Sequence, residues 1–150
     1  MARVFVILGE SQSGKSTTIR ALTGAFKRGK RQVATQDGNM NIFVQICALQ
    51  EANISPEEFV QTINATENGP DVLVALRLRA SRDNPDAFEY IERFRQEGWD
   101  IAAIVLLGPA PQESSNRLSE ISHEFFAIPD SKEPPANWIA HQIRERWGWQ

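Results

Sequence analysis

The feature that most constrains the fold is a glycine-rich segment, residues 9–17, which follows the first apolar run of the chain. That run, RVFVIL at residues 3–8, is typical of a buried β-strand. Helical spacing of apolar residues begins directly after the segment. The segment itself matches G-x-x-x-x-G-K-[ST] in full, at Gly9, Gly14, Lys15 and Ser16. A strand, a tight turn and a helix must therefore succeed one another near the start of the chain.

The first helix is predicted to start at about Lys15 and to bury an apolar face made by Ile19, Leu22 and Phe26. Residues 31–49 then contain Asp37-Gly38 between β-branched and alternating residues, which indicates a β-hairpin. Basic residues cluster at 27–31, KRGKR. We interpret them as solvated cations that complement the negative end of the first helix.

Start and stop signals predict further helices. Ser55 with Glu58 forms a capping box for a helix that begins at Pro56. Asn84 is the predicted cap of the next helix, which Gly98 ends. A short helix is expected within residues 109–123. The last helix, within 134–149, has an apolar stripe of Trp138, Ile139, Ile143 and Trp147.

Two nearly unbroken apolar runs, 71–78 and 100–108, are typical of strands covered on both faces, and 124–130 predicts a shorter strand. Strands that alternate with helices indicate an α/β fold with a mostly parallel central sheet, to which the hairpin can add one antiparallel strand. A length of 150 residues without a linker favours a single domain, residues 1–150.

Composition limits the partners. A net charge of −3 argues against a nucleic-acid partner, because such binding usually needs a basic face. Since no apolar run approaches the roughly 20 residues that span a bilayer, we expect no membrane partner. The single cysteine, Cys47, is expected in the core and suits a cytoplasmic protein.

The residue types of the glycine-rich segment suit a chain of phosphates. Gly9 allows a sharp turn, and the amides of residues 11–17 form a concave nest at the positive end of the helix. Lys15 can neutralise outer phosphate oxygens, and the Ser16 hydroxyl can ligate Mg²⁺. The predicted phosphate-binding residues are Gly9, Glu10, Ser11, Gln12, Ser13, Gly14, Lys15, Ser16 and Thr17.

At Gly9, Gly14, Lys15 and Ser16 the chain resembles the P-loop NTPases, the Walker A superfamily. The resemblance implies a three-layer P-loop NTPase fold, a bound nucleoside triphosphate (ATP or GTP) and Mg²⁺. Beyond these residues the resemblance is only an α/β pattern, and it does not say which reaction follows.

The usual second metal residue is an acid at the end of a strand beside the first strand. If residues 40–49 form that neighbour, the layout resembles the small Ras-like GTPases, and the acid position falls near Cys47. If residues 71–78 form it, the layout resembles the small P-loop kinases, and the strand ends in arginines. Neither place holds an acid, and the guanine-reading N-K-x-D is absent after residues 100–108, which favours ATP over GTP.

Asp37 is the first candidate to replace that acid as a metal residue, and Glu51 the second; a plain turn residue is the alternative for Asp37. Arginines at 77, 79 and 82 follow a predicted central strand, where they can hold a phosphate or simply pair with surface acids. Lys15 and Arg79 are the predicted catalytic residues. No zinc site is expected at His123 or His141.

These features predict a nucleoside triphosphate-binding protein, for ATP rather than GTP, that carries out Mg²⁺-dependent hydrolysis or phosphoryl transfer to an unidentified acceptor. The alternative is a non-catalytic nucleotide-sensing or interaction module that kept the loop, lost the acid and acts on a protein partner. An exposed Trp149 is a candidate partner contact, with packing as its other explanation.

Overall fold

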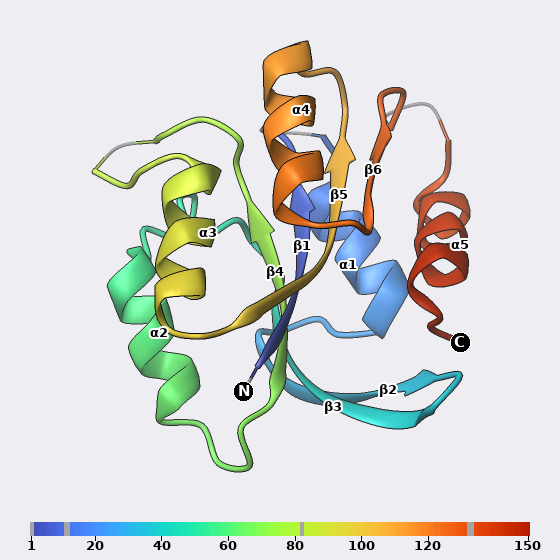
Figure 1. Ribbon diagram of the computed structural model, residues 1–150. Helices are drawn as coiled ribbons and strands as arrows, with labels where there is room; N and C mark the ends of the chain where they lie inside the picture. Colours follow the sequence, from blue (N-terminus) through green and yellow to red (C-terminus); the bar gives the residue numbers. More distant parts are fainter. Residues whose placement is uncertain (1, 11–12, 82, 132–133) are drawn as a thin grey trace.

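The computed structural model describes residues 2–10, 13–81, 83–131 and 134–150 (Figure 1). Strands and helices alternate along the chain as follows: β1 (Arg3–Leu8), α1 (Lys15–Thr23), β2 (Gly29–Thr35), β3 (Gly38–Gln45), α2 (Pro56–Asn64), β4 (Asp71–Leu76), α3 (Ala87–Gln96), β5 (Asp100–Leu107), α4 (Gln112–Ile121), β6 (Phe125–Ile128) and α5 (Ala136–Trp147).

One sheet contains these strands in the order β2-β3-β4-β1-β5-β6. All neighbouring pairs are parallel except β2 and β3, which form the predicted antiparallel hairpin. In the centre, Val6 of β1 lies opposite Val74 of β4 and Ile104 of β5. The carboxyl ends of the parallel strands share one edge of the sheet, called the carboxyl edge below; the amino edge is opposite.

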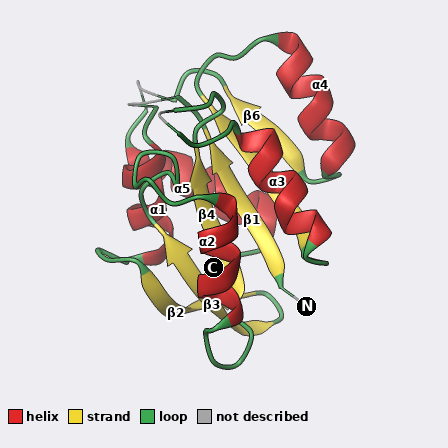
Figure 2. Cartoon of the chain, turned by 90° about the vertical axis from the view of Figure 1, so that its left-hand side faces the viewer, coloured by secondary structure: helices red, strands yellow, loops and turns green. Residues whose placement is uncertain are grey.

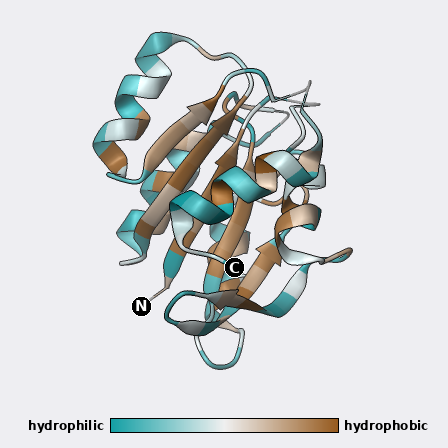
Figure 3. Ribbon diagram, turned by 90° about the vertical axis from the view of Figure 1, so that its right-hand side faces the viewer, coloured by the Kyte–Doolittle hydropathy of each residue, from teal (hydrophilic) through white to brown (hydrophobic). Residues whose placement is uncertain are grey.

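Helices cover both faces of the sheet, so the molecule has three layers and the α/β expectation is confirmed. Buried side chains of α2, α3 and α4 pack on one face, and those of α1 and α5 on the other. Figure 2 shows α1 and α5 on one side of the strands and α3 and α4 on the other. In Figure 3 the central strands are hydrophobic along most of their length, as strands buried on both faces must be.

Short sequence signals correctly predicted the start of α2 and the presence of the hairpin. The capping box of α2 is present: the Ser55 side chain accepts a hydrogen bond from the Glu58 amide, and the Glu58 carboxylate accepts one from the Ser55 amide. The hairpin pairs Thr35 with Gly38, so its turn is Gln36-Asp37 rather than Asp37-Gly38.

The predicted cap of α3 was wrong. Asp86, rather than Asn84, caps the helix by accepting a hydrogen bond from the Glu89 amide at 3.1 Å. Asn84 is buried outside the helix, and its side-chain amide donates to Asn53 Oδ1 at 2.9 Å. Both residue types can cap a helix, and the tertiary contact with Asn53 decides between them.

Two aromatic residues predicted to be buried are exposed. Because α1 ends at Thr23 with left-handed Gly24 (φ 71°), Phe26 lies beyond the helix, and 81% of it is exposed. In α5, Ile139, Ala140 and Ile143 form the buried stripe and Trp138 points to solvent.

The basic cluster at residues 27–31 also lies beyond α1, whose last turn carries only Arg20 as a cation. These residues occupy the loop after α1 and the start of β2 instead. The cluster therefore does not complement the dipole of α1 as predicted. Among the described residues, no helix has the length and apolar character needed to cross a bilayer.

Candidate functional site

The glycine-rich segment connects the carboxyl end of β1 to α1. The Gly9 amide donates to the Leu76 carbonyl at 3.2 Å, which fixes the start of the loop against β4. A Cβ on Gly9 would lie 2.2 Å from Ser13 Oγ and 2.8 Å from the Leu107 carbonyl oxygen. At the other end Gly14 is left-handed, with φ 94°. The loop therefore requires glycine at position 9, where a Cβ would clash, and at position 14, where the backbone is left-handed.

The amino end of α1 is left open for an anion. Its N-cap is Gly14, no described side chain caps it, and its first turn holds no acid. The first-turn amides of a helix have no partner within the helix, and they carry the positive end of its dipole. An anion at the loop would satisfy both the amides and the dipole.

Lys15 is buried, with 4% exposure, although it carries a charge. Its Nζ donates to the Glu10 carbonyl at 2.7 Å and lies 3.8 Å from a Glu51 carboxylate oxygen. Burial lowers the pKa of Lys15 below its usual value, and Glu51 partly offsets this. The lysine is thus folded into the loop with little water around it.

Ser16 and Thr18 continue the site on α1. The Ser16 hydroxyl donates to the Ile46 carbonyl at 3.2 Å, just beyond β3, so its oxygen lone pairs stay available to a ligand. Thr18 is buried, and no described group partners its hydroxyl oxygen. Thr17, predicted to bind phosphate, is exposed on the same turn.

The neighbours of β1 are β4 and β5, and β3 lies one position further out, beyond β4. The arrangement that placed residues 40–49 next to the first strand is therefore not the one found. Asp71 begins β4 at the amino edge, where it pairs with Arg3 at 2.9 Å. Beyond the other end of β4 stand Arg77 and Arg79, which both pair with Glu10 of the loop. Here too no acid follows β4 directly.

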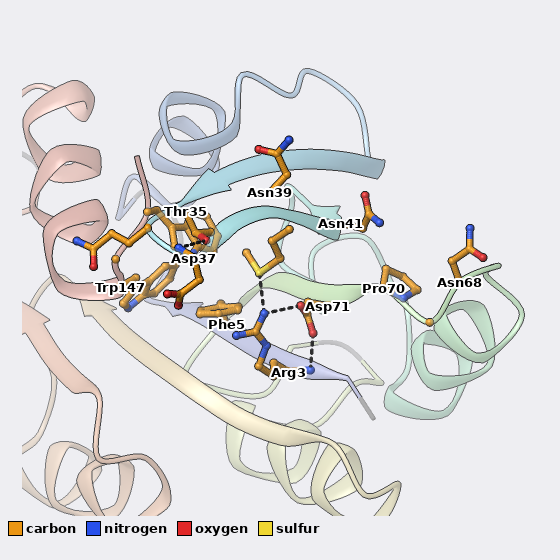
Figure 4. Close-up of a pocket in the computed structure, with 15 residues that line it drawn as sticks. Arg3, Phe5, Thr35, Asp37, Asn39, Asn41, Asn68, Pro70, Asp71 and Trp147 are labelled. Carbon is orange, nitrogen blue, oxygen red and sulfur yellow. Dashed lines mark hydrogen bonds and ion pairs between the residues drawn. The ribbon is translucent and has the colours of Figure 1, made fainter.

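Asp37 does not lie with Ser16. It is part of the hairpin turn at the amino edge, at the opposite end of the sheet from the loop. There it lines a pocket of about 450 Å³ together with Arg3, Phe5 and Trp147 (Figure 4). Glu51, the second candidate acid, is the one that the fold brings to Lys15.

Two contributors to the site were not predicted from the sequence. The Ser131 hydroxyl donates to the Ser13 carbonyl at 2.8 Å, which ties the loop to the segment after β6. Gln50 is fully buried and hydrogen-bonds to the backbone of Arg77. Ser131 could have been predicted as a site residue, because it follows a short parallel strand and ligands of open α/β sheets bind at the carboxyl ends of such strands.

Three of the predicted site residues are not described by the structure, and the environment of Cys47 differs from the predicted one. Ser11, Gln12 and Arg82 lie outside the described residues. Cys47 was expected in the core, but it is exposed, because it follows β3 at the carboxyl edge where the strand leaves the sheet. Within the described part of the chain, no group of histidine, cysteine and acidic residues could hold a metal ion by itself.

Near the other sheet edge, Trp149 is buried rather than exposed. Its ring lies against Phe5 and Trp147, with centroids 5.1 Å from each. A backbone bridge to Thr35 also holds it on the outer side of β2. Packing against these two rings therefore accounts for the burial of Trp149.

Neither a protein-family model nor a curated protein matches the chain. Among solved structures, it is similar to the G-domain of FeoB from Methanococcus jannaschii, with 14% sequence identity and a TM-score of 0.48. The similarity covers 98% of this chain and 99% of that one. The α/β fold itself follows from the strand order and the two helical layers.

Proposed function

We propose that residues 9–17 bind the phosphates of a nucleoside triphosphate, ATP rather than GTP, and that the chain acts as one nucleotide-binding unit. The observation that carries the proposal is the buried Lys15 inside a loop that opens onto an uncapped helix end. A buried ammonium beside free amides is costly without an anion and favourable with one. The preference for ATP rests on the missing N-K-x-D sequence. A cytoplasmic location suits this ligand and the unpaired Cys47.

The residues present fit a bound Mg²⁺. Ser16 offers a hydroxyl oxygen, and Glu51, which follows β3 at the same edge, offers a carboxylate. Oxygen ligands of these two kinds are those that Mg²⁺ prefers, and the ion usually keeps several waters. A bound Mg²⁺ would neutralise part of the negative charge of the phosphates. Glu51 would face it directly or through water, in place of the acid that is missing after β4.

The reaction that fits is hydrolysis or transfer of the terminal phosphoryl group. In the loose transition state of this transfer, negative charge is spread over the oxygens of the phosphoryl group and builds up on the leaving oxygen, and cations that are already in place stabilise it. Lys15 is held in such a place by the loop. Arg79 lies at the rim, where its pairing with Glu10 leaves it 78% exposed. A non-catalytic sensing module is the second candidate, because arginine rather than an acid follows β4.

Binding and turnover of Mg·ATP and Mg·GTP, measured by calorimetry and by phosphate release, test the proposal. Lys15→Ala removes a charged hydrogen-bonding group and should weaken ATP binding by roughly tenfold to a hundredfold. Lys30→Ala, an exposed lysine on β2, is the control and should bind like the wild type.

Turnover that disappears in Lys15→Ala supports an enzyme. Tight binding without turnover supports the sensing module. Absence of binding of either nucleotide to the wild type contradicts both. Glu51→Gln should leave nucleotide binding in EDTA intact and abolish the gain in affinity from Mg²⁺. If the gain survives, Glu51 is not the metal-facing acid.

A further inference from the structure

Three cations converge on Glu10, the residue after the first glycine of the loop. Its carbonyl oxygen accepts the hydrogen bond from Lys15. Its carboxylate lies 3.4 Å from Arg77 and 3.8 Å from Arg79. The arginines that follow β4 are therefore turned toward the loop by a carboxylate that belongs to the loop itself.

The position of Arg77 is set by a buried side chain. The Gln50 amide donates to the Arg77 carbonyl at 2.9 Å, and its oxygen accepts from the Arg77 amide at 2.9 Å. Gln50 also donates to the Pro85 carbonyl at 3.2 Å and has no exposed surface. Because Gln50 bonds both the amide and the carbonyl of Arg77, it fixes the backbone at the end of β4 and with it the direction of the Arg77 side chain.

The contact between Glu10 and Arg77 leaves hydrogen-bonding capacity unused. Glu10 Oε1 and Arg77 Nε are buried, and neither has a hydrogen-bond partner among the described residues. The interaction of a guanidinium with an anion is strongest when two of its N–H groups donate to two oxygens of that anion side by side. A buried donor without a partner destabilises the structure that contains it. The Glu10 carboxylate accepts a hydrogen bond from a terminal nitrogen of Arg77 and not from its Nε. A phosphate group has several oxygens, so it could accept hydrogen bonds from both that nitrogen and Nε.

We propose that the Glu10 carboxylate is an internal substitute for phosphate, which Arg77 and Arg79 exchange for a phosphate group of the ligand. This inference rests on the proposed function of the loop and adds a regulatory contact to it. In the ligand-free state, Glu10 offsets one of the two positive charges of Arg77 and Arg79 and holds both side chains at the loop. On binding, the ligand displaces the carboxylate toward solvent, and the arginines close onto it. Gln50 is the positioning residue, because its hydrogen bonds to the Arg77 backbone keep the Arg77 side chain directed toward the loop, where it meets either Glu10 or the phosphate.

Removing the carboxylate should therefore strengthen binding. Glu10→Gln is expected to bind inorganic tripolyphosphate about threefold to tenfold more tightly than the wild type, a range typical of the loss of one partly exposed ion pair. Glu57→Gln is the matched control. It makes the same charge change at an ion pair on α2, with Arg93, and should leave the affinity unchanged. An equal or weaker affinity of Glu10→Gln relative to Glu57→Gln overturns the proposal.

A double-mutant cycle separates exchange from simple repulsion between the carboxylate and the ligand. In the Arg77→Met/Arg79→Met background, Glu10→Gln should no longer improve binding, since no arginine is left to release. If the improvement persists there, repulsion explains it and the exchange is overturned. If the wild type, Glu10→Gln and Lys15→Ala all fail to bind tripolyphosphate, the proposed function itself is wrong.

NMR of the Arg77 side chain supplies a readout independent of affinity. Its Nε–H resonance should shift in Glu10→Gln and should shift again when tripolyphosphate is added to the wild type. Gln50→Leu should broaden or move this resonance in the absence of any ligand. A resonance that responds to neither Glu10→Gln nor the ligand contradicts the exchange.

Discussion

Lys15 carries a charge in a place that water barely reaches, so its protonation is coupled to whatever occupies the loop. Burial lowers its pKa, and the nearby Glu51 and Glu10 act in the opposite direction. In the window between that lowered pKa and 10.5, the unfolded chain binds more protons than the folded one. Stability therefore rises with pH across this window.

Anion affinity should change in the opposite sense over the same pH window. Because a phosphate binds the ammonium form, the affinity for tripolyphosphate should fall as pH rises from neutrality toward 10.5. Calorimetry at fixed ionic strength measures the effect. Lys15→Arg keeps its charge throughout this range and should give a flatter profile. A wild-type affinity that does not change over the window would show that Lys15 does not contact the anion.

Gly9 offers a second test at a single residue. Since the Leu107 carbonyl is backbone and cannot move aside, Gly9→Ala should lower the free energy of unfolding by about 1–3 kcal/mol. It should also weaken anion binding, because the loop must shift. Urea denaturation and tripolyphosphate titration measure the two effects. Ser13→Ala removes the nearest side-chain oxygen without adding an atom and is the control, expected to unfold at nearly the wild-type urea concentration.

At the scale of elements, helix ends depend on local chemistry when the capping groups lie within one turn. The box of Ser55 and Glu58 is of this kind, and its sequence signature was sufficient to place the start of α2. The start of α3 was not predictable in this way. Asn84 is drawn to Asn53, which is distant in sequence, and leaves the cap to Asp86.

Ser55→Ala should reduce the free energy of unfolding by about 1 kcal/mol, because the Glu58 amide loses its partner. Gln61→Ala, at an exposed position of the same helix, should have almost no effect. Urea denaturation of both variants gives the comparison. Equal midpoints for the two variants would mean that the box contributes nothing to stability.

At the scale of the whole molecule, the two phenylalanines Phe94 and Phe26 show how tertiary packing assigns roles. Both occur in helical patterns with apolar neighbours. Phe94 of α3 is fully buried and contacts the rings of Phe59 and Trp99. Phe26 lies outside α1 and has no such contacts in the described structure. Helix periodicity alone could not tell them apart.

Phe94→Ala should lower the free energy of unfolding by about 3–5 kcal/mol, through lost burial and the cavity left behind. Phe26→Ala should change it by less than about 0.5 kcal/mol. Thermal or urea unfolding followed by circular dichroism compares them. A large loss of stability in Phe26→Ala would show that this side chain is covered in solution.

The sequence by itself determined the strand-loop-helix unit at the start of the chain, the hairpin and the alternation of buried strands with helices. Each of these depends on contacts between residues close in the chain, such as a glycine turn, a capping box or an apolar period. Only the tertiary structure decided that β4 lies between β1 and β3 and that Asp37 lies at the far edge. It also brought Glu51 to Lys15 and Arg77 to Glu10. Such pairs form where strands distant in sequence end at one sheet edge, and local spacing does not encode that order.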